Sequence, residues 1–255
     1  MRGSKRRSRR RISSVRVAGV DLGGTTYTVA LLNGRGRVLR SDEFPTDTGV
    51  GSQVLLERIA ASILSLGGKD KAVAIGVGIP GLLDARRGIA LHCPNLPGWR
   101  DVPVARLLRR SLGVPVVIEN DVNAATRAEL HLGAGRGVKD FICLTLGTGI
   151  GGGIVVDGKV VRGATGSAGE IGHMVIEPSG PDCPCGRRGC LELYASGSAI
   201  ARRMRERIVA GETSLALDLS EGWIDAITAK HVFDAAGRGD RVALEVVDSA
   251  AEVLG

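Results

Sequence analysis

The chain has 255 residues, of which 44% are apolar and 24% are charged, a balance that excludes an intrinsically disordered protein. No apolar run approaches the roughly 18–20 residues that a membrane-spanning helix needs, so no membrane partner is expected. The formal net charge of +7 comes from residues 1–11, which hold seven of the 34 Lys and Arg residues and no acid.

We interpret the basic N-terminal stretch, residues 1–14, as a disordered solubilising arm. Such an arm can contact nucleic acid or an anionic surface, but this one has no interleaved aromatic residues and no adjoining recognition helix. Nucleic acid is therefore not an expected partner. Because the arm lacks the apolar core of a secretion signal, and five Cys do not suggest a disulfide scaffold, we expect a cytoplasmic protein.

Strand and helix patterns alternate between residues 15 and 133. Apolar runs joined by Gly-Gly-Thr-Thr and Asn-Gly-Arg-Gly predict antiparallel hairpins, and apolar residues at helical spacing predict the helices that follow. The expected strands are 15–22, 27–32, 37–44, 72–81 and 114–121, and the expected helices are 52–67, 102–113 and 122–133.

A pattern of the same kind begins again at residue 141. The strand FICLTL at 141–146 leads into a glycine-rich turn, and IVVDGKVVRG at 154–163 has the pattern of a hairpin. Two similar α/β halves predict two lobes with a cleft between them, which we place at 15–119 and 120–255.

The turn after residue 146 has the spacing Gly147-x-Gly149-x-x-Gly152 of a dinucleotide fingerprint. A fingerprint of that kind must open a helix, whereas a strand follows here, and no Gly-Lys-Ser/Thr of a Walker loop is present. A similar turn, Asp21-Leu-Gly-Gly-Thr-Thr, follows the first strand. One such turn is usually a structural hairpin, but two favour a phosphate group held from both sides, with Asp21 placed to hold Mg²⁺.

Asn120 and Asp121 stand where a buried strand meets a helix, at the edge of the sheet where α/β proteins bind ligands. Asp121 can be an ordinary helix N-cap. In the functional interpretation it accepts a hydroxyl proton while that oxygen attacks a phosphoryl group.

One His and three Cys form the most specific local signal. His173, Cys183, Cys185 and Cys190 match a closed Cys₃His zinc site, and Gly186 and Gly189 give the loop freedom to turn. The alternatives are a disulfide beside two free thiols, or unpaired thiols. Four protein ligands indicate a structural ion.

Two glutamates lie close to this cluster in the sequence. Glu170 precedes His173 by three residues, and Glu192 follows Cys190 by two. Each alone has the pattern of a solvated surface acid, but a zinc-bound loop would hold both rigidly enough to bind sugar hydroxyls. A zinc-bound imidazole also keeps its second nitrogen for a ligand.

Together these residues resemble the ROK family (repressors, open reading frames and sugar kinases), whose fold is the α/β, hexokinase/actin-like (ribonuclease H-like) fold with two lobes. The resemblance runs across nearly the whole chain after the basic arm. It rests on DLGGTT (21–26), IPG (79–81), CPNLPGW (93–99), ENDVNAA (119–125), LGTGIGGG (146–153), GEIGH (169–173) and CPCGRRGCLELYASG (183–197).

The resemblance implies an ATP-dependent hexose kinase, glucokinase-like, that forms a homo-oligomer, a dimer or a tetramer. It also implies that fructose, mannose, allose or an N-acetylated hexosamine can replace glucose as the substrate. The implied roles are as follows: catalytic base, Asp121; sugar binding, Gly81, Asn120, Asp121, Glu170, His173 and Glu192; zinc, His173, Cys183, Cys185 and Cys190; ATP phosphates and Mg²⁺, Asp21, Gly23, Gly24, Thr25, Thr26, Gly147, Thr148, Gly149, Gly151 and Gly152.

Members of the family normally continue past the equivalent of AAEVLG (250–255) through helices, a strand and a glycine-rich turn beside adenosine. We therefore expect this chain to be a fragment or a frameshifted product whose nucleotide site is incomplete. The alternative functions are a sugar-responsive transcriptional repressor and a non-catalytic sugar-binding protein. Only 14 residues precede the first predicted strand, too few for the winged helix-turn-helix of the repressors.

Overall fold

A computed structural model describes residues 14–67 and 71–255. The contacts among these residues divide the chain into two compact units. The first unit ends at Phe141 and takes in Val155–Ala168 as well, and the second contains Ile142–Ile154 and Gly169–Gly255. The basic arm predicted at 1–14 lies, except for its last residue, outside the described residues. The lobes predicted at 15–119 and 120–255 follow a different division, and their limits stay a prediction.

A five-stranded sheet in the order β3-β2-β1-β4-β8 forms the centre of the first unit. Its strands are β1 (Arg16–Leu22), β2 (Thr26–Asn33), β3 (Val38–Pro45), β4 (Ile75–Ile79) and β8 (Val116–Asn120). β1, β2 and β3 are antiparallel neighbours, as the two predicted hairpins require, whereas β1, β4 and β8 run parallel. The carboxyl ends of the three parallel strands therefore meet at one edge of the sheet.

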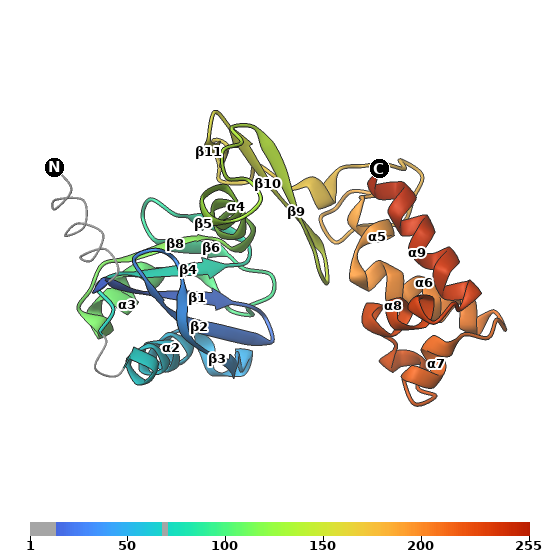
Figure 1. The fold of residues 1–255 in the computed structure, drawn as a ribbon, viewed down its shortest axis with the longest axis horizontal. Coiled ribbons are helices and arrows are strands. Elements are labelled where there is room, and N and C mark those ends of the chain that lie inside the picture. The colour runs from blue at the N-terminus through green and yellow to red at the C-terminus, as the bar shows by residue number, and fades with distance from the viewer. Residues whose placement is uncertain (1–13, 68–70) are drawn as a thin grey trace, which may run out of the picture. The chain divides into compact units, whose positions relative to one another are not determined.

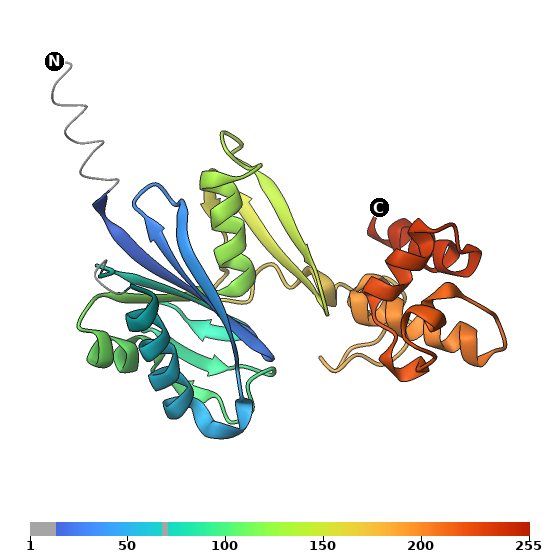
Figure 2. The ribbon, with the colours of Figure 1, turned by 60° about the horizontal axis from the view of Figure 1, so that its bottom comes forward.

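Three helices cover this sheet. Helices α2 (Gly51–Gly67) and α3 (Val104–Leu112) lie on one face, and α4 (Asp121–Leu132) lies on the other, next to β4 and β8 (Figures 1 and 2). The core contains the inward residues of β1 and β4 together with Leu55, Ile59 and Leu108 from the helices. A 3₁₀ turn, η1 (Thr48–Val50), precedes α2, and a small antiparallel sheet consists of β5 (Leu82–Asp84), β6 (Ile89–His92) and β7 (Arg100–Val102).

The second unit is largely helical. The chain enters it through β9 (Phe141–Leu146) and β10 (Ile150–Val156), and β10 then pairs with β11 (Lys159–Val160) in the predicted Asp-Gly hairpin. The elements after β11 are η2 (Ile171–His173), α5 (Glu192–Ala195), α6 (Gly197–Val209), α7 (Leu215–Leu219), η3 (Ile224–Ala226), α8 (Ala229–Gly237) and α9 (Arg241–Leu254).

Side chains of Ser, Thr and Asp cap the amino-terminal ends of α6, α7, α8 and α9. Ser196, Ser214, Thr228 and Asp240 each accept a hydrogen bond from a backbone N–H of the first turn, which satisfies a donor that has no partner within the helix. The helices pack around a second core that includes Ile150 of β10 and Met204 of α6. No helix in the described part of the chain is long and apolar enough to cross a membrane.

Candidate functional site

The first glycine turn follows β1 and joins it to β2. Gly23 donates its N–H to the carbonyl of Thr26 at 2.9 Å, and the hydroxyl of Thr46 donates to the carbonyl of Gly23 at 2.8 Å. A Cβ added at Gly24 would lie 2.9 Å from the carbonyl oxygen of Asn95, in the CPNLPGW loop. Glycine is therefore required at position 24 because this loop packs directly on the turn.

Asn120 and Asp121 lie at the carboxyl edge of the sheet, as predicted. The parallel register places Gly78 of β4 between Asp21 of β1 and Glu119 of β8. Asp21, near the end of β1, and Asp121, directly after β8, therefore lie at the same edge of the sheet. The amide of Asn120 donates to the carbonyl of Gly81 at 3.4 Å. Three of the predicted sugar-binding residues thus gather in the first unit.

Asn120, not Asp121, is the N-cap of α4, so the alternative interpretation of Asp121 as a helix cap is wrong. The side-chain oxygen of Asn120 accepts from the N–H of Asn123 at 3.1 Å, and Asp121 is the first residue of the helix. Burial raises the pKa of the Asp121 carboxyl above its ordinary value, and the negative charge of Asp21 adds a smaller increase. A carboxylate with a raised pKa is a stronger proton acceptor.

Sequence reasoning missed two neighbours of Asp121. The thiol of Cys93 is buried, and burial together with the charge of Asp121 raises its pKa to about 11. Glu119, whose side chain is 15% exposed, forms ion pairs with Arg127 and Arg162. These arginines balance the charge of an acid two positions before Asp121.

The second glycine turn lies between β9 and β10. Gly147 and Thr148 are exposed, and their carbonyls accept hydrogen bonds from the N–H of Gly197 at 2.8 Å and the hydroxyl of Ser198 at 2.7 Å. Gly152 has a different role, because a Cβ there would lie 2.6 Å from the carbonyl oxygen of Gly169. This glycine allows the GEIGH segment to pack directly on β10.

The remaining predicted sugar-binding residues belong to the second unit. Glu170 is exposed and precedes η2, where its carbonyl accepts from the N–H of His173 at 3.1 Å. Glu192 begins α5, and its Oε2 accepts from the N–H of Ile150 at 2.8 Å. The surface-acid alternative is therefore wrong for Glu192, whose carboxylate binds the backbone of the glycine turn.

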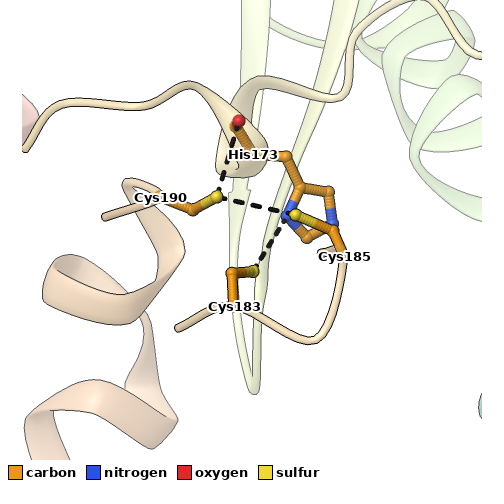
Figure 3. Close-up of side chains that lie close together, drawn as sticks. All are labelled: His173, Cys183, Cys185 and Cys190. Carbon is orange, nitrogen blue, oxygen red and sulfur yellow. Dashed lines mark hydrogen bonds between the residues drawn. The ribbon is translucent and has the colours of Figure 1, made fainter. Parts of the chain in front are cut away.

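The four predicted zinc ligands come together in the second unit (Figure 3). Their ligand atoms all lie within 4.8 Å of one another. Nδ1 of His173 is 3.6 Å from Sγ of Cys183, and Sγ of Cys185 is 3.7 Å from Sγ of Cys190. The second distance is far above the roughly 2.05 Å of a disulfide bond, and all three cysteines are free.

These distances fit a tetrahedral zinc ion. With Zn–S bonds of about 2.3 Å and a Zn–N bond of about 2.0–2.1 Å, a regular tetrahedron has edges of about 3.8 Å between sulfurs and about 3.6 Å between sulfur and nitrogen. The two recorded distances are close to these values. The chain's donor set and its spacing therefore suit zinc.

A cavity of about 510 Å³ opens beside the second glycine turn, within the second unit. Its lining includes the apolar residues Ile200, Phe233 and Val247 and the hydroxyl-bearing residues Thr148, Ser198 and Thr228. A mostly apolar lining with a few polar residues suits a nucleoside whose phosphates reach the turn. Sequence reasoning identified Thr148 but missed the residues from α6 and α8.

The predicted site residues thus form two sets, one in each compact unit. In the first unit they are Asp21, Gly23, Gly24, Thr25, Thr26, Gly81, Asn120 and Asp121, and in the second they are Gly147, Thr148, Gly149, Gly151, Gly152, Glu170, His173, Cys183, Cys185, Cys190 and Glu192.

Comparison with known proteins agrees with this arrangement of motifs. The ROK family profile matches residues 17–255. A glucokinase from Thermotoga maritima is 42% identical over 240 residues, which are 94% of this chain and 75% of that protein. The crystal structure of a ROK family glucokinase from Streptomyces griseus in complex with glucose and AMPPNP has a TM-score of 0.83 at 37% identity, and covers 93% of this chain and 76% of that one.

A ROK family transcriptional regulator, a homolog of the E. coli MLC protein, has a TM-score of 0.84 at 29% identity, over 95% of this chain and 61% of that one. The predicted α/β, hexokinase/actin-like fold is confirmed by these similarities. Motifs, fold and family profile agree from one end of the described residues to the other, and the chain belongs to the ROK family.

Proposed function

We propose that this protein is an ATP-dependent hexose kinase that phosphorylates glucose to glucose 6-phosphate. The observation that carries the proposal is Asp121, a partly buried carboxyl of raised pKa at the ligand-binding edge of the sheet. The 42% identity to the Thermotoga maritima glucokinase and the 37% identity to a glucokinase crystallised with glucose and AMPPNP support the choice of substrates.

In the proposed reaction the 6-hydroxyl oxygen of glucose attacks the γ-phosphorus of ATP. Asp121 accepts the hydroxyl proton, the bond between the γ-phosphorus and the β–γ bridging oxygen breaks, and ADP leaves with that electron pair. Phosphoryl transfer requires mainly alignment and charge stabilisation, and a general base contributes about 10²–10⁴ in rate. The N–H of Val122, which donates to Oδ1 of Asp121 at 3.0 Å, fixes the orientation of this carboxyl.

Asn120, Gly81, Glu170, His173 and Glu192 would bind the sugar hydroxyls. The bond between Asn120 and Gly81 orients one amide and one backbone carbonyl at the same edge. His173 presents Nδ1 to Cys183, which leaves Nε2 for a sugar hydroxyl. A site that satisfies each hydroxyl with a hydrogen bond discriminates strongly against sugars that lack one.

The nucleotide would contact both glycine turns. In the first, Gly23 shapes the turn, Gly24, Thr25 and Thr26 offer backbone N–H groups and hydroxyls, and Asp21 is exposed at the end of β1 where it can bind Mg²⁺ through water. In the second, exposed Gly147 and Thr148 border the 510 Å³ cavity. The cavity would hold the nucleoside.

Cys183, Cys185, Cys190 and His173 would hold a structural zinc ion. Four protein ligands leave no open position, so the ion cross-links the loop and supplies no Lewis acid. Its effect on the reaction is indirect, because Glu170, His173 and Glu192 all extend from the loop that it fixes. We further propose that the protein is cytoplasmic and forms a homo-oligomer.

The test is release of ADP in a coupled assay with glucose, mannose, fructose, allose and N-acetylmannosamine. We expect glucose to give the highest kcat/KM, and Asp121→Asn to lose at least about 10² in kcat. Asp218→Asn, an exposed carboxylate on α7, is the matched control. Turnover near the wild-type level in Asp121→Asn would refute the assigned base.

Two alternatives remain measurable in the same preparation. Specific DNA binding at physiological salt in a gel-shift experiment would favour a repressor, a class represented by the 29% identical transcriptional regulator. Calorimetry that shows glucose binding without nucleotide binding would favour a non-catalytic sugar-binding protein.

A further inference from the structure

We infer that Glu192 is a positioning residue for the glycine turn at 147–150, besides its proposed contact with sugar. Nucleotide affinity would then depend on this carboxylate even when no sugar is bound. The structural part of this inference stands on the second unit alone, whereas its consequence for nucleotide rests on the proposed function.

The contact that carries the inference joins a side chain to the backbone of the turn. Oε2 of Glu192 accepts from the N–H of Ile150 at 2.8 Å, at a partly buried position. A hydrogen bond to a carboxylate is about twice as strong as one between neutral groups. Among residues 14–67 and 71–255, none donates to Oε1 of Glu192, so the second oxygen stays open to a sugar hydroxyl.

Glycine at position 149 is what lets the carboxylate reach this N–H. A Cβ added at Gly149 would overlap Oε2 of Glu192 and lie 3.1 Å from its Cδ. The middle glycine of the Gly-x-Gly-x-x-Gly spacing therefore makes room for an acid from α5. This explains the residue by packing within the unit, without reference to a phosphate.

Two more bonds hold the turn from the same side. The N–H of Gly197 donates to the carbonyl of Gly147, and the hydroxyl of Ser198 donates to the carbonyl of Thr148. The continuous segment 192–198 therefore binds the N–H of Ile150 at one end of the turn and the carbonyls of Gly147 and Thr148 at the other. These bonds fix the geometry of the exposed residues Gly147 and Thr148 before a nucleotide arrives. Less conformational entropy is then lost when the nucleotide binds.

Five variants of the full chain test the inference: Glu192→Ala, Glu192→Gln, Gly149→Ala, the double variant Glu192→Ala/Gly149→Ala, and the control Glu206→Gln, an exposed glutamate on α6. Hydrogen exchange of the peptide 146–153 in the ligand-free protein reports the turn directly. Fluorescence titration with an N-methylanthraniloyl derivative of ADP, in Mg²⁺ and without sugar, reports nucleotide affinity. Thermal unfolding and zinc content show whether each variant is folded.

We expect Glu192→Ala and Gly149→Ala to speed exchange in 146–153 and to weaken nucleotide binding by about tenfold, the usual effect of losing a hydrogen bond to a charged group. Glu192→Gln restores most of both, because its amide oxygen can still accept from Ile150. Gly149→Ala adds nothing to Glu192→Ala, since the overlapping atoms are gone. Glu206→Gln leaves exchange in this peptide unchanged.

Wild-type exchange and wild-type nucleotide affinity in folded Glu192→Ala would overturn the inference. So would a raised glucose KM as the only change, because that is the result of a sugar contact alone. If the wild-type protein binds no nucleotide and phosphorylates no hexose, the proposed function fails, and the exchange comparison still decides whether Glu192 positions the turn.

Discussion

Replacing Gly152 by Ala distinguishes a glycine that is needed for packing from Gly147, a glycine proposed to contact phosphate. The added Cβ would lie 2.6 Å from the carbonyl oxygen of Gly169 and 2.6 Å from Cγ1 of Ile171. The contact with oxygen is the more serious, because it belongs to the backbone and cannot move by a change of rotamer. The GEIGH segment must therefore shift away from β10 by several tenths of an ångström.

Adding a methyl group to a well-packed site costs about 1–3 kcal/mol. In a protein of this size each kcal/mol lowers Tm by about 2–4 °C, so we expect a decrease of about 4–8 °C for a 2 kcal/mol loss. Glu170 and His173 move with the segment, and a displacement of about 1 Å at reacting groups can cost about 10² in rate. We therefore expect lower kcat/KM for glucose and weaker zinc retention.

The assay is differential scanning calorimetry, with zinc content and glucose kinetics measured on the same preparation. Gly147→Ala is the matched control for stability, because nothing lies within 4 Å of a Cβ added at this exposed glycine of the same turn. A Gly152→Ala protein with unchanged Tm and unchanged zinc would refute the packing argument. Equal destabilisation by Gly147→Ala would refute the distinction between the two glycines.

Four further outcomes follow from the site. Because the folded state raises the pKa of Asp121, this carboxyl stabilises the fold below its unfolded pKa and loses that contribution as pH rises. Asp121→Asn should therefore raise Tm at pH 7 while it lowers kcat by at least about 10², and an unchanged or lower Tm would contradict the burial effect. Asp21→Asn removes a like charge, so the acidic limb of kcat/KM should move to lower pH, with an unmoved limb contradicting the coupling. Metal analysis should find about one zinc ion per chain. Cys185→Ser or chelation should lower both the zinc content and the affinity for glucose, and fresh protein without zinc would refute the site. Arg162→Ala should lower kcat more than Arg162→Lys, because Glu119 loses a partner two residues before Asp121, and equal kcat values would show that the ion pair does not position the acid.

Local patterns predicted the five strands of the central sheet in the first unit and its three helices, but not the small sheet of β5, β6 and β7. The turns Gly-Gly-Thr-Thr and Asn-Gly-Arg-Gly fix both hairpins, and helical spacing gives α2 to within one residue of 52–67. Helices α6 to α8 of the second unit were not predicted, because their formation depends on packing around a shared core.

Residue types were enough to name the candidate site residues, but not to predict their partners. Sequence spacing cannot tell which of Asn120 and Asp121 caps α4, because both side chains suit an N-cap, and the choice depends on the backbone angle at the end of β8. Nor can it show that Glu192 meets Ile150, 42 residues away. Such contacts depend on which surfaces face each other after folding. For the same reason the sequence does not show that Gly149 makes room for Glu192 or that Gly152 makes room for the GEIGH segment.

The first unit is assembled from two separate stretches of chain, which constrains how the protein can be made. Val155–Ala168 supplies β11 and Arg162, the partner of Glu119, so the first unit is complete only after these residues have left the ribosome. A gene cut between codons 141 and 155 would deprive the amino-terminal product of a strand and an ion pair. A division after Ala168 keeps the first unit whole but separates Ile142–Ile154, with Ile150 of the second core, from the rest of the second unit, so no single cut leaves both units intact.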